Sequence, residues 1–250
     1  MPSKDTNTGA KRARETRQLL GLDTTAPIGC VLTAVEADLE LPVIVAELPE
    51  GVAGCCWRDG DQVVLWVNGT HATVRQRFTL AHELGHVRCG HDTGILVDTF
   101  ETLSGRSTDS REVQANAFAA ELLAPKAGVE EFVTSEPTLD DVVRLAARFG
   151  ISTIAALFRL NSSGLTGRYP ALKQEIDDGL HGEVWDRLAP NAPDDAINAI
   201  DREALPRISL ALEGSALAAM IRGRISIGAA AAAAGCNAKH LASGAAAIGV

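Results

Sequence analysis

Residues 82–86 read His-Glu-Leu-Gly-His, and this pentapeptide restricts what the chain can fold into more than any other feature. Residues four apart on an α-helix lie on one face, so the imidazoles of His82 and His86 can reach a single tetrahedral metal ion. Glu83 then lies beside the remaining coordination position, where a glutamate can act as a general base. The motif therefore predicts a helix with a metal site on one face.

The segments around the motif predict a mixture of strands and helices. Short apolar runs bounded by turn residues are typical of strands, and three precede the motif: 42–46, 55–57 and 62–68. Apolar residues at helical spacing predict the motif helix and later helices: 73–91, 111–123, 139–149 and 153–160. Residues 92–109 are rich in Thr and Ser, so we expect a loop there that forms a mobile flap over the cleft.

A catalytic metal site needs a third protein ligand and a free position for water. His91 follows His86 by five residues, about 140° further round an ideal helix, so it reaches the same ion only if the helix breaks sharply. Glu112 lies on the next predicted helix, and Asn116 follows one turn later on the same face. Such a helix can bring a carboxylate to the metal while the polar residue supports a ligand histidine. We therefore expect Glu112, and not His91, to be the third ligand.

Composition excludes several classes of protein. The chain has 250 residues, of which 46% are hydrophobic and 22% charged, so it is long and apolar enough to fold around a core and is not a disordered protein. Its net charge of −9 argues against a protein that mainly binds nucleic acid, because phosphate contacts need clustered Lys and Arg. We expect no direct contact with nucleic acid.

Other patterns bear on location. Residues 1–20 lack the apolar core of a secretory signal, and the apolar stretch 225–250 consists mainly of Ala and Gly, too weakly hydrophobic to span a bilayer. The five cysteines form an odd number without CxxC spacing, so structural disulfides are not expected. These observations predict a cytoplasmic protein without a membrane anchor.

Two segments give the chain a specific resemblance. Residues 76–86 read Gln-Arg-Phe-Thr-Leu-Ala-His-Glu-Leu-Gly-His, and residues 112–125 read Glu-Val-Gln-Ala-Asn-Ala-Phe-Ala-Ala-Glu-Leu-Leu-Ala-Pro. Together they resemble the ImmA/IrrE family of bacterial metallopeptidases, over roughly residues 27–165. The resemblance implies an α+β fold: a zincin-like domain with a small antiparallel or mixed sheet, an active-site helix and further helices, followed by a mostly helical C-terminal region.

The resemblance also implies an activity. His82, His86 and Glu112 would bind one Zn²⁺, with Mn²⁺ as the alternative ion, and Glu83 would be the catalytic base. Family members are typically paired with a helix-turn-helix repressor of the Xre type, which they cleave or cause to be cleaved, and this frees genes for the stress response or for mobile-element transfer. We therefore expect a zinc-dependent endopeptidase that acts on a protein substrate of this kind.

We divide the chain into three regions: an N-terminal extension over 1–26, the metallopeptidase domain over 27–168, and a helical region over 169–250 with a linker near 190–193. Residues 138–160 and 226–247 each have a helix-turn-helix outline. A DNA-binding regulator is therefore one alternative, although 153–160 offers few polar side chains for base edges. A metal-bound module that senses a partner without catalysis is the other, but such a site would not require Glu83.

Overall fold

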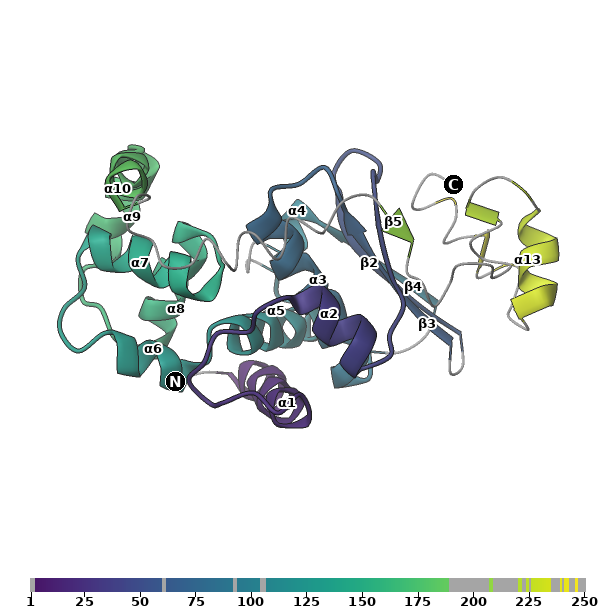
Figure 1. Cartoon of the computed structure of the whole chain (residues 1–250), viewed down its shortest axis with the longest axis horizontal. Coiled ribbons are helices and arrows are strands. Elements are labelled where there is room, and N and C mark those ends of the chain that lie inside the picture. Colours follow the sequence, from purple (N-terminus) through teal and green to yellow (C-terminus); the bar gives the residue numbers. More distant parts are fainter. Residues whose placement is uncertain are drawn as a thin grey trace.

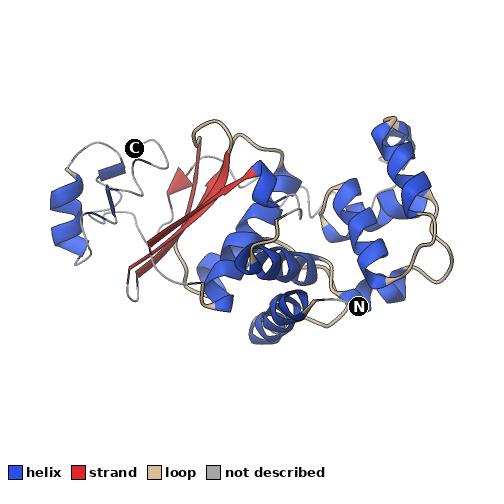
Figure 2. Cartoon of the chain, turned by 180° about the vertical axis from the view of Figure 1, so that it is seen from behind, coloured by secondary structure: helices blue, strands red, loops and turns tan. Residues whose placement is uncertain are grey.

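The protein is described here by a computed structural model. It covers residues 3–59, 62–91, 94–103 and 107–188, and from the C-terminal region residues 207–208, 220–221, 224, 226–234, 239, 241–242 and 246. A mixed sheet packs against helices, so the predicted α+β fold is confirmed (Figures 1 and 2). The linker predicted near 190–193 lies outside the described residues, as does much of the 226–247 outline.

The sheet has five strands in the order β4-β2-β3-β1-β5. Their bounds are β1 Val43–Ala46, β2 Val52–Asp59, β3 Gln62–Asn68, β4 Gly94–Thr99 and β5 Arg207–Ile208. Strand β2 forms a hairpin with β3, as the sequence predicts, and β1 runs parallel to β3. Strands β4 and β5 lie at the two edges and pair antiparallel with β2 and β1. The small mixed sheet is thus confirmed.

The prediction of a loop over 92–109 is wrong for residues 94–103. These residues form β4 and the short helix α4 (Phe100–Leu103), and β4 is held by a ladder to β2 in which Cys56 pairs with Leu96. The Thr and Ser residues that suggested a loop lie mostly after the strand. A short strand gains its stability from pairing with a distant neighbour, which local composition does not report.

The helices begin and end close to where the sequence predicts. Helix α3 spans Thr73–Cys89 and ends at Gly90, whose φ of 72° is the left-handed conformation that glycine adopts readily. Helix α5 spans Ser110–Leu123, and the side chain of Asp109 caps it. The other helical segments are α1 Lys4–Leu19, α2 Val31–Thr33 with the π-helical η1 Ala34–Asp38, α6 Lys126–Phe132, α7 Leu139–Phe149, α8 Thr153–Ser163, α9 Tyr169–Asp177, α10 Leu180–Leu188 and α13 Ile227–Ala234.

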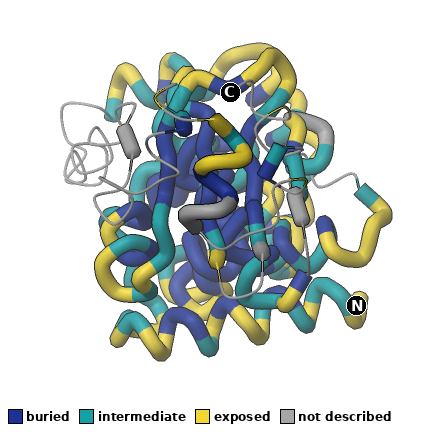
Figure 3. Tube along the Cα trace, turned by 90° about the vertical axis from the view of Figure 1, so that its right-hand side faces the viewer, coloured by how far each residue is buried: buried dark blue, intermediate teal, exposed yellow. Residues whose placement is uncertain are grey.

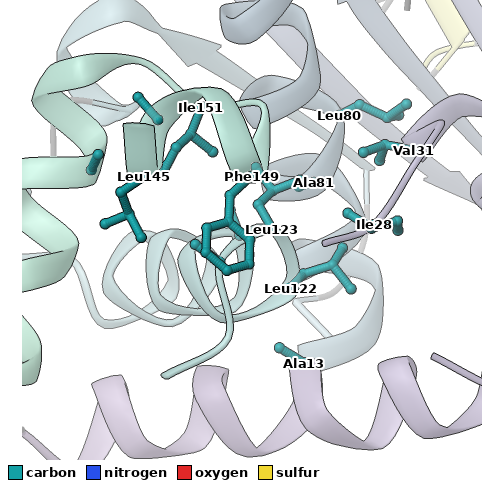
Figure 4. Close-up of a cluster of buried hydrophobic side chains, with 14 of the residues drawn as sticks. Ala13, Ile28, Val31, Leu80, Ala81, Leu122, Leu123, Leu145, Phe149 and Ile151 are labelled. Atoms are coloured by element: carbon teal, nitrogen blue, oxygen red, sulfur yellow. The ribbon is translucent and has the colours of Figure 1, made fainter. Parts of the chain in front are cut away.

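The main core lies between one face of the sheet and the helices. Apolar side chains from α1, α2, α3, α5 and α7 meet there, as the close-up shows for Ala13, Val31, Leu80, Leu122 and Phe149 (Figure 4). Figure 3 shows buried segments running through the middle of the molecule, with exposed segments around them. Helix α8 adds buried residues to this core. This agrees with the observation that 153–160 offers few polar side chains for contacts with DNA bases.

A second, smaller cluster covers the opposite face of the sheet. Trp57 and Trp66 lie there together with Ala230 and Ala231 of α13 and with Leu241. In Figure 1, α13 stands on the far side of the sheet from α5. The described residues of the C-terminal region are therefore part of the packing of this domain. None of the described helices is both long and apolar enough to cross a bilayer.

Two buried arginines join segments that are distant in sequence. Arg17 on α1 donates to the backbone carbonyls of Leu122, Asp23 and Ala26. Arg77 on α3 donates to the carbonyls of Ile28, Gly29 and Gly150. Hydrogen bonds from a charged donor to carbonyls that would otherwise be buried without partners are among the stronger stabilising contacts.

Helix α1 packs against α5 at a distance that only glycine allows. A Cβ atom on Gly9 would lie 2.0 Å from the backbone oxygen of Gln114 and 3.0 Å from the backbone nitrogen of Phe118. The residues that we assigned to an N-terminal extension thus lie against the helix that carries Glu112. The boundaries at residues 26 and 168 stay predictions.

We predict that Gly9→Ala lowers the free energy of unfolding by about 1–3 kcal/mol, because the added methyl group forces the α1 and α5 backbones apart. Denaturant titration followed by circular dichroism measures this change. The matched control is Gly182→Ala on α10, where a Cβ meets nothing within 4 Å. That change should be neutral or stabilising by up to about 1 kcal/mol. Equal stability of the two variants would contradict the close α1–α5 packing.

Candidate metal centre

Helix α3 carries the motif into the interior of the protein. His82, Glu83 and His86 each have 0% exposed surface. The two histidines present their Nε2 atoms to each other at 3.0 Å, as the i, i+4 spacing predicts. Both ring nitrogens therefore face one point next to α3.

Helix α5 brings Glu112 to the same point. Its Oε2 lies 3.3 Å from His82 Nε2, and its Oε1 lies 3.7 Å from His86 Nε2. The approach of the two helices depends on Gly85, where a Cβ would lie 3.1 Å from both Cα and O of Ala115. The structure thus brings together the three residues that the sequence suggested as ligands.

Asp98 on β4 is a fourth member of the group, and the sequence analysis missed it. Its Oδ2 lies 3.4 Å from His82 Nε2 and 3.5 Å from His86 Nε2. One ligand atom from each of His82, His86, Asp98 and Glu112 lies within 4.8 Å of the others. The available signal was a single acidic residue within the apolar run Gly94–Val97, which becomes informative only once that run is known to be a strand.

The donor atoms fit a metal ion. Asp98 Oδ2, Glu112 Oε2 and both oxygens of Glu83 are buried and make no hydrogen bond of normal geometry among the described residues. Buried carboxylates are costly unless they are paired or coordinate a cation. Two imidazoles and neighbouring carboxylates are the donors that bind divalent transition metals in proteins. The group could therefore hold one metal ion.

Asn116 fixes the ring of His82 from the side opposite the donor cluster. His82 Nδ1 lies 3.0 Å from Asn116 Oδ1, an acceptor, so Nδ1 carries the proton of the neutral ring and Nε2 is the nitrogen that can bind a metal. Asn116 Nδ2 donates to the backbone oxygen of Thr102, just after β4. The expectation that Asn116 supports a ligand histidine agrees with this contact, and Asn116 also ties the site to α4.

His91 orients His86 and lies outside the four-residue group. His91 Nδ1 lies 3.0 Å from His86 Nδ1, and His91 Nε2 lies 3.2 Å from Gln114 Oε1. Gln114 Nε2 in turn donates to Asp5 Oδ1 on α1. Because the amide oxygen accepts from His91 Nε2, the proton between the rings comes from His86 Nδ1. This chain leaves His86 Nε2 unprotonated and facing Glu112.

The charges at the site favour a cation. Burial lowers the pKa of His82, but the nearby carboxylates of Asp98 and Glu112 outweigh it and raise this pKa to about 9. Burial also tends to raise the pKa of Glu112, but the nearby imidazoles of His82 and His86 hold it well below its usual range. Burial, with the nearby charges of Asp98 and Glu112, raises the pKa of Glu83 well above the ordinary value. These directions mean that the cluster favours a positive charge, on His82 or on a bound cation, beside the Glu112 carboxylate.

Gly54 on β2 makes room for the Glu83 carboxylate. A Cβ atom there would lie 2.5 Å from Glu83 Oε1, 2.5 Å from Thr79 Cγ2 and 2.9 Å from the backbone oxygen of Trp66. Gly54 pairs with Asp98 across the β2–β4 ladder, next to an irregularity in the register. A glycine in a strand often marks such a close approach.

Known proteins share sequence similarity with the region that contains this site. The IrrE N-terminal-like domain, Peptidase_M78, matches residues 49–161. The radiation response metalloprotease IrrE of Deinococcus radiodurans is 34% identical over 110 residues, and IrrE of Deinococcus deserti is 34% identical over 129 residues. "Uncharacterized immunity region protein 2" of Bacillus phage phi105 is 31% identical over 104 residues.

These similarities cover only part of each protein. The matches span 42% and 50% of this chain and 34% and 46% of the two Deinococcus proteins, in that order. For the phage protein they span 42% of this chain and 65% of the relative. The matched region includes the motif helix, β4 and α5, which supply all four residues of the cluster. Residues 49–161 of the chain therefore match an IrrE-like domain, in agreement with the resemblance to the ImmA/IrrE family of metallopeptidases.

Proposed function

We propose that this protein is a zinc-dependent endopeptidase in which His82, His86 and Glu112 hold the ion and Glu83 is the general base. The observation that carries the proposal is the Glu83 carboxylate, which is fully buried beside the three ligands and has no hydrogen bond of normal geometry. A site that only stabilised the fold would gain nothing from this costly additional carboxylate. This argues against the non-catalytic module.

The donor set favours zinc. Two imidazoles and one carboxylate are a common protein ligand set of catalytic Zn²⁺, while Mn²⁺ prefers a site richer in oxygen. When bound, the ion supplies Lewis acidity, which activates water as a nucleophile and polarises the carbonyl of the scissile bond. We propose one Zn²⁺ per chain, with Mn²⁺ as the alternative.

Residues of the chain carry out the proton transfers and orient the two histidines. Glu83 accepts the proton of the attacking water and delivers it to the nitrogen of the leaving amine. The buried surroundings that raise its pKa favour the uptake of a proton by this carboxylate. Asn116 and His91 keep the two imidazole rings in the tautomer that leaves Nε2 free.

We propose a protein substrate, specifically a helix-turn-helix repressor of the Xre type whose cleavage relieves repression of stress-response genes. The support is the family resemblance and the similarity to a phage protein named for an immunity region. We place the protein in the cytoplasm, in keeping with four described cysteines that are all free. The direct test is incubation with the repressor encoded nearest the gene, followed by mass spectrometry of the products.

We predict that Glu83→Gln abolishes hydrolysis, with a loss of about 10²–10⁴-fold or more, because the amide keeps the shape of the side chain but cannot accept the proton. Zinc content measured by mass spectrometry should stay near one ion per chain, and the circular dichroism spectrum should be unchanged. Cleavage of the repressor at the wild-type rate would overturn the role of Glu83.

We predict that Glu112→Ala weakens zinc affinity far more than His91→Ala does. Glu112 supplies a donor atom, whereas His91 acts through His86, and loss of such an outer partner typically costs about 10–100-fold in affinity. Competition with a chromophoric chelator measures both affinities. Metal retained by the Glu112 variant and lost by the His91 variant would reverse the assignment.

We predict that Gly54→Ala lowers kcat strongly, because a Cβ atom there displaces the Glu83 carboxylate and presses on the backbone oxygen of Trp66. Zinc affinity should change much less than kcat, since Gly54 contacts no ligand among the three. Gly29→Ala is the matched control, because a Cβ there meets nothing within 4 Å. Kinetics equal to those of the wild type in the Gly54 variant would contradict this placement of Glu83.

A further inference from the structure

Asp98 supports an inference that goes beyond the proposed zinc site and rests on it, because it concerns the same ion. We propose that Asp98 is a fourth protein ligand, which closes the coordination sphere and makes this conformation a latent one. Strand β4 must then withdraw Asp98 before water and substrate can take the fourth position.

The distances from the two histidines to Asp98 are close to those of a tetrahedral site. The edge of a tetrahedron is about 1.6 times the bond length, so ligand atoms about 2.0–2.1 Å from zinc lie about 3.3–3.4 Å apart. Asp98 Oδ2 lies 3.4 Å and 3.5 Å from the Nε2 atoms of His82 and His86. Glu112 lies 3.3 Å and 3.7 Å from the same two atoms. Asp98 is therefore placed as well for coordination as Glu112.

The Asp98 carboxylate is buried among the donor atoms of the site. The residue is 2% exposed, and Oδ2 makes no hydrogen bond of normal geometry among the described residues. A buried carboxylate in this position is stabilised by the histidines, by a proton shared with Glu83 or by a cation. A metal ion bound by both residues would give a partner to Asp98 Oδ2 and to the equally buried Glu112 Oε2.

The backbone of β4 aims Asp98 at the site. Asp98 pairs with Gly54, and directly opposed residues of an antiparallel pair point to the same face of the sheet. The Cβ direction of Gly54 leads to the Glu83 carboxylate, so the Asp98 side chain also points toward α3. The shift in register between Val52 and Gly54 lies at this pair, and such irregularities commonly re-aim a side chain.

The location of β4 allows the ligand to leave. β4 is an edge strand that is bonded along one side, to β2, so a local displacement breaks one ladder and spares β3 and β1. Closed sites with four protein ligands are structural, whereas catalytic sites keep a position open. With Asp98 bound, Glu83 faces a filled coordination sphere. Release of Asp98 converts one kind of site into the other.

The test uses the full chain loaded with Co²⁺, whose visible spectrum reports the ligands, and azide as a small anion that binds only at an open position. We expect the wild-type spectrum to be insensitive to azide and the Asp98→Ala spectrum to shift with it. Zn²⁺ affinity of Asp98→Ala, measured by chelator competition, should fall by more than the about 10–100-fold expected for an outer partner. Asp98→Asn, which keeps the side-chain shape, provides a second variant if the alanine variant unfolds.

Thr99→Ala is the matched control, because Thr99 is the next residue on β4 and is exposed. It should match the wild type in both measurements. If both Asp98 variants have the Zn²⁺ affinity and the azide response of the wild type, Asp98 is not a fourth ligand. Loss of metal binding in His82→Ala would in that case still support the proposed function. Absence of metal binding by the wild-type chain would overturn both proposals. Azide binding to the wild-type Co²⁺ protein at high affinity would overturn the closed site alone.

Discussion

The close packing of α3 against α5 is the contact on which the rest of the site depends. At Gly85 the two backbones approach so closely that an added Cβ would lie 3.1 Å from Ala115 Cα. This approach places Glu112 and Asn116, one turn apart on α5, on opposite sides of the His82 ring. A larger residue at position 85 would separate the helices and move both partners of His82 together. One glycine thus sets the distance between two histidines on one helix and a carboxylate on another.

The cost of burying the ionisable residues explains how the surrounding fold is organised. Four acidic or basic residues meet with at most 8% of each exposed, and such groups are tolerated when each is paired or binds a cation. The apolar core beneath them, with Leu80, Leu122 and Phe149, supplies the compensating stabilisation. A metal ion that binds only the folded chain would add to this stability. We therefore regard metal binding and folding as coupled in this domain.

Hydrogen bonds extend the site well beyond its ligands. From His86 they run through His91 and Gln114 to Asp5, and from His82 they run through Asn116 to Thr102. One chain reaches α1 and the other reaches the segment after β4, the strand that carries Asp98. Because each link fixes a proton position, the orientation of both imidazoles depends on elements far from the motif in sequence. The N-terminal helix is in this sense part of the metal centre.

The sequence by itself determined what short-range geometry can encode. The i, i+4 spacing of His82 and His86 implied a shared face, and the mixture of strands and helices and most helix bounds followed from hydrophobic period and turn residues. Local pattern could not reveal β4, because a short strand is stabilised by pairing with β2, a partner some forty residues earlier in the sequence. Asp98, Gly54 and the role of His91 therefore emerged only from the tertiary structure, where sheet register and helix packing decide which distant side chains share one buried space.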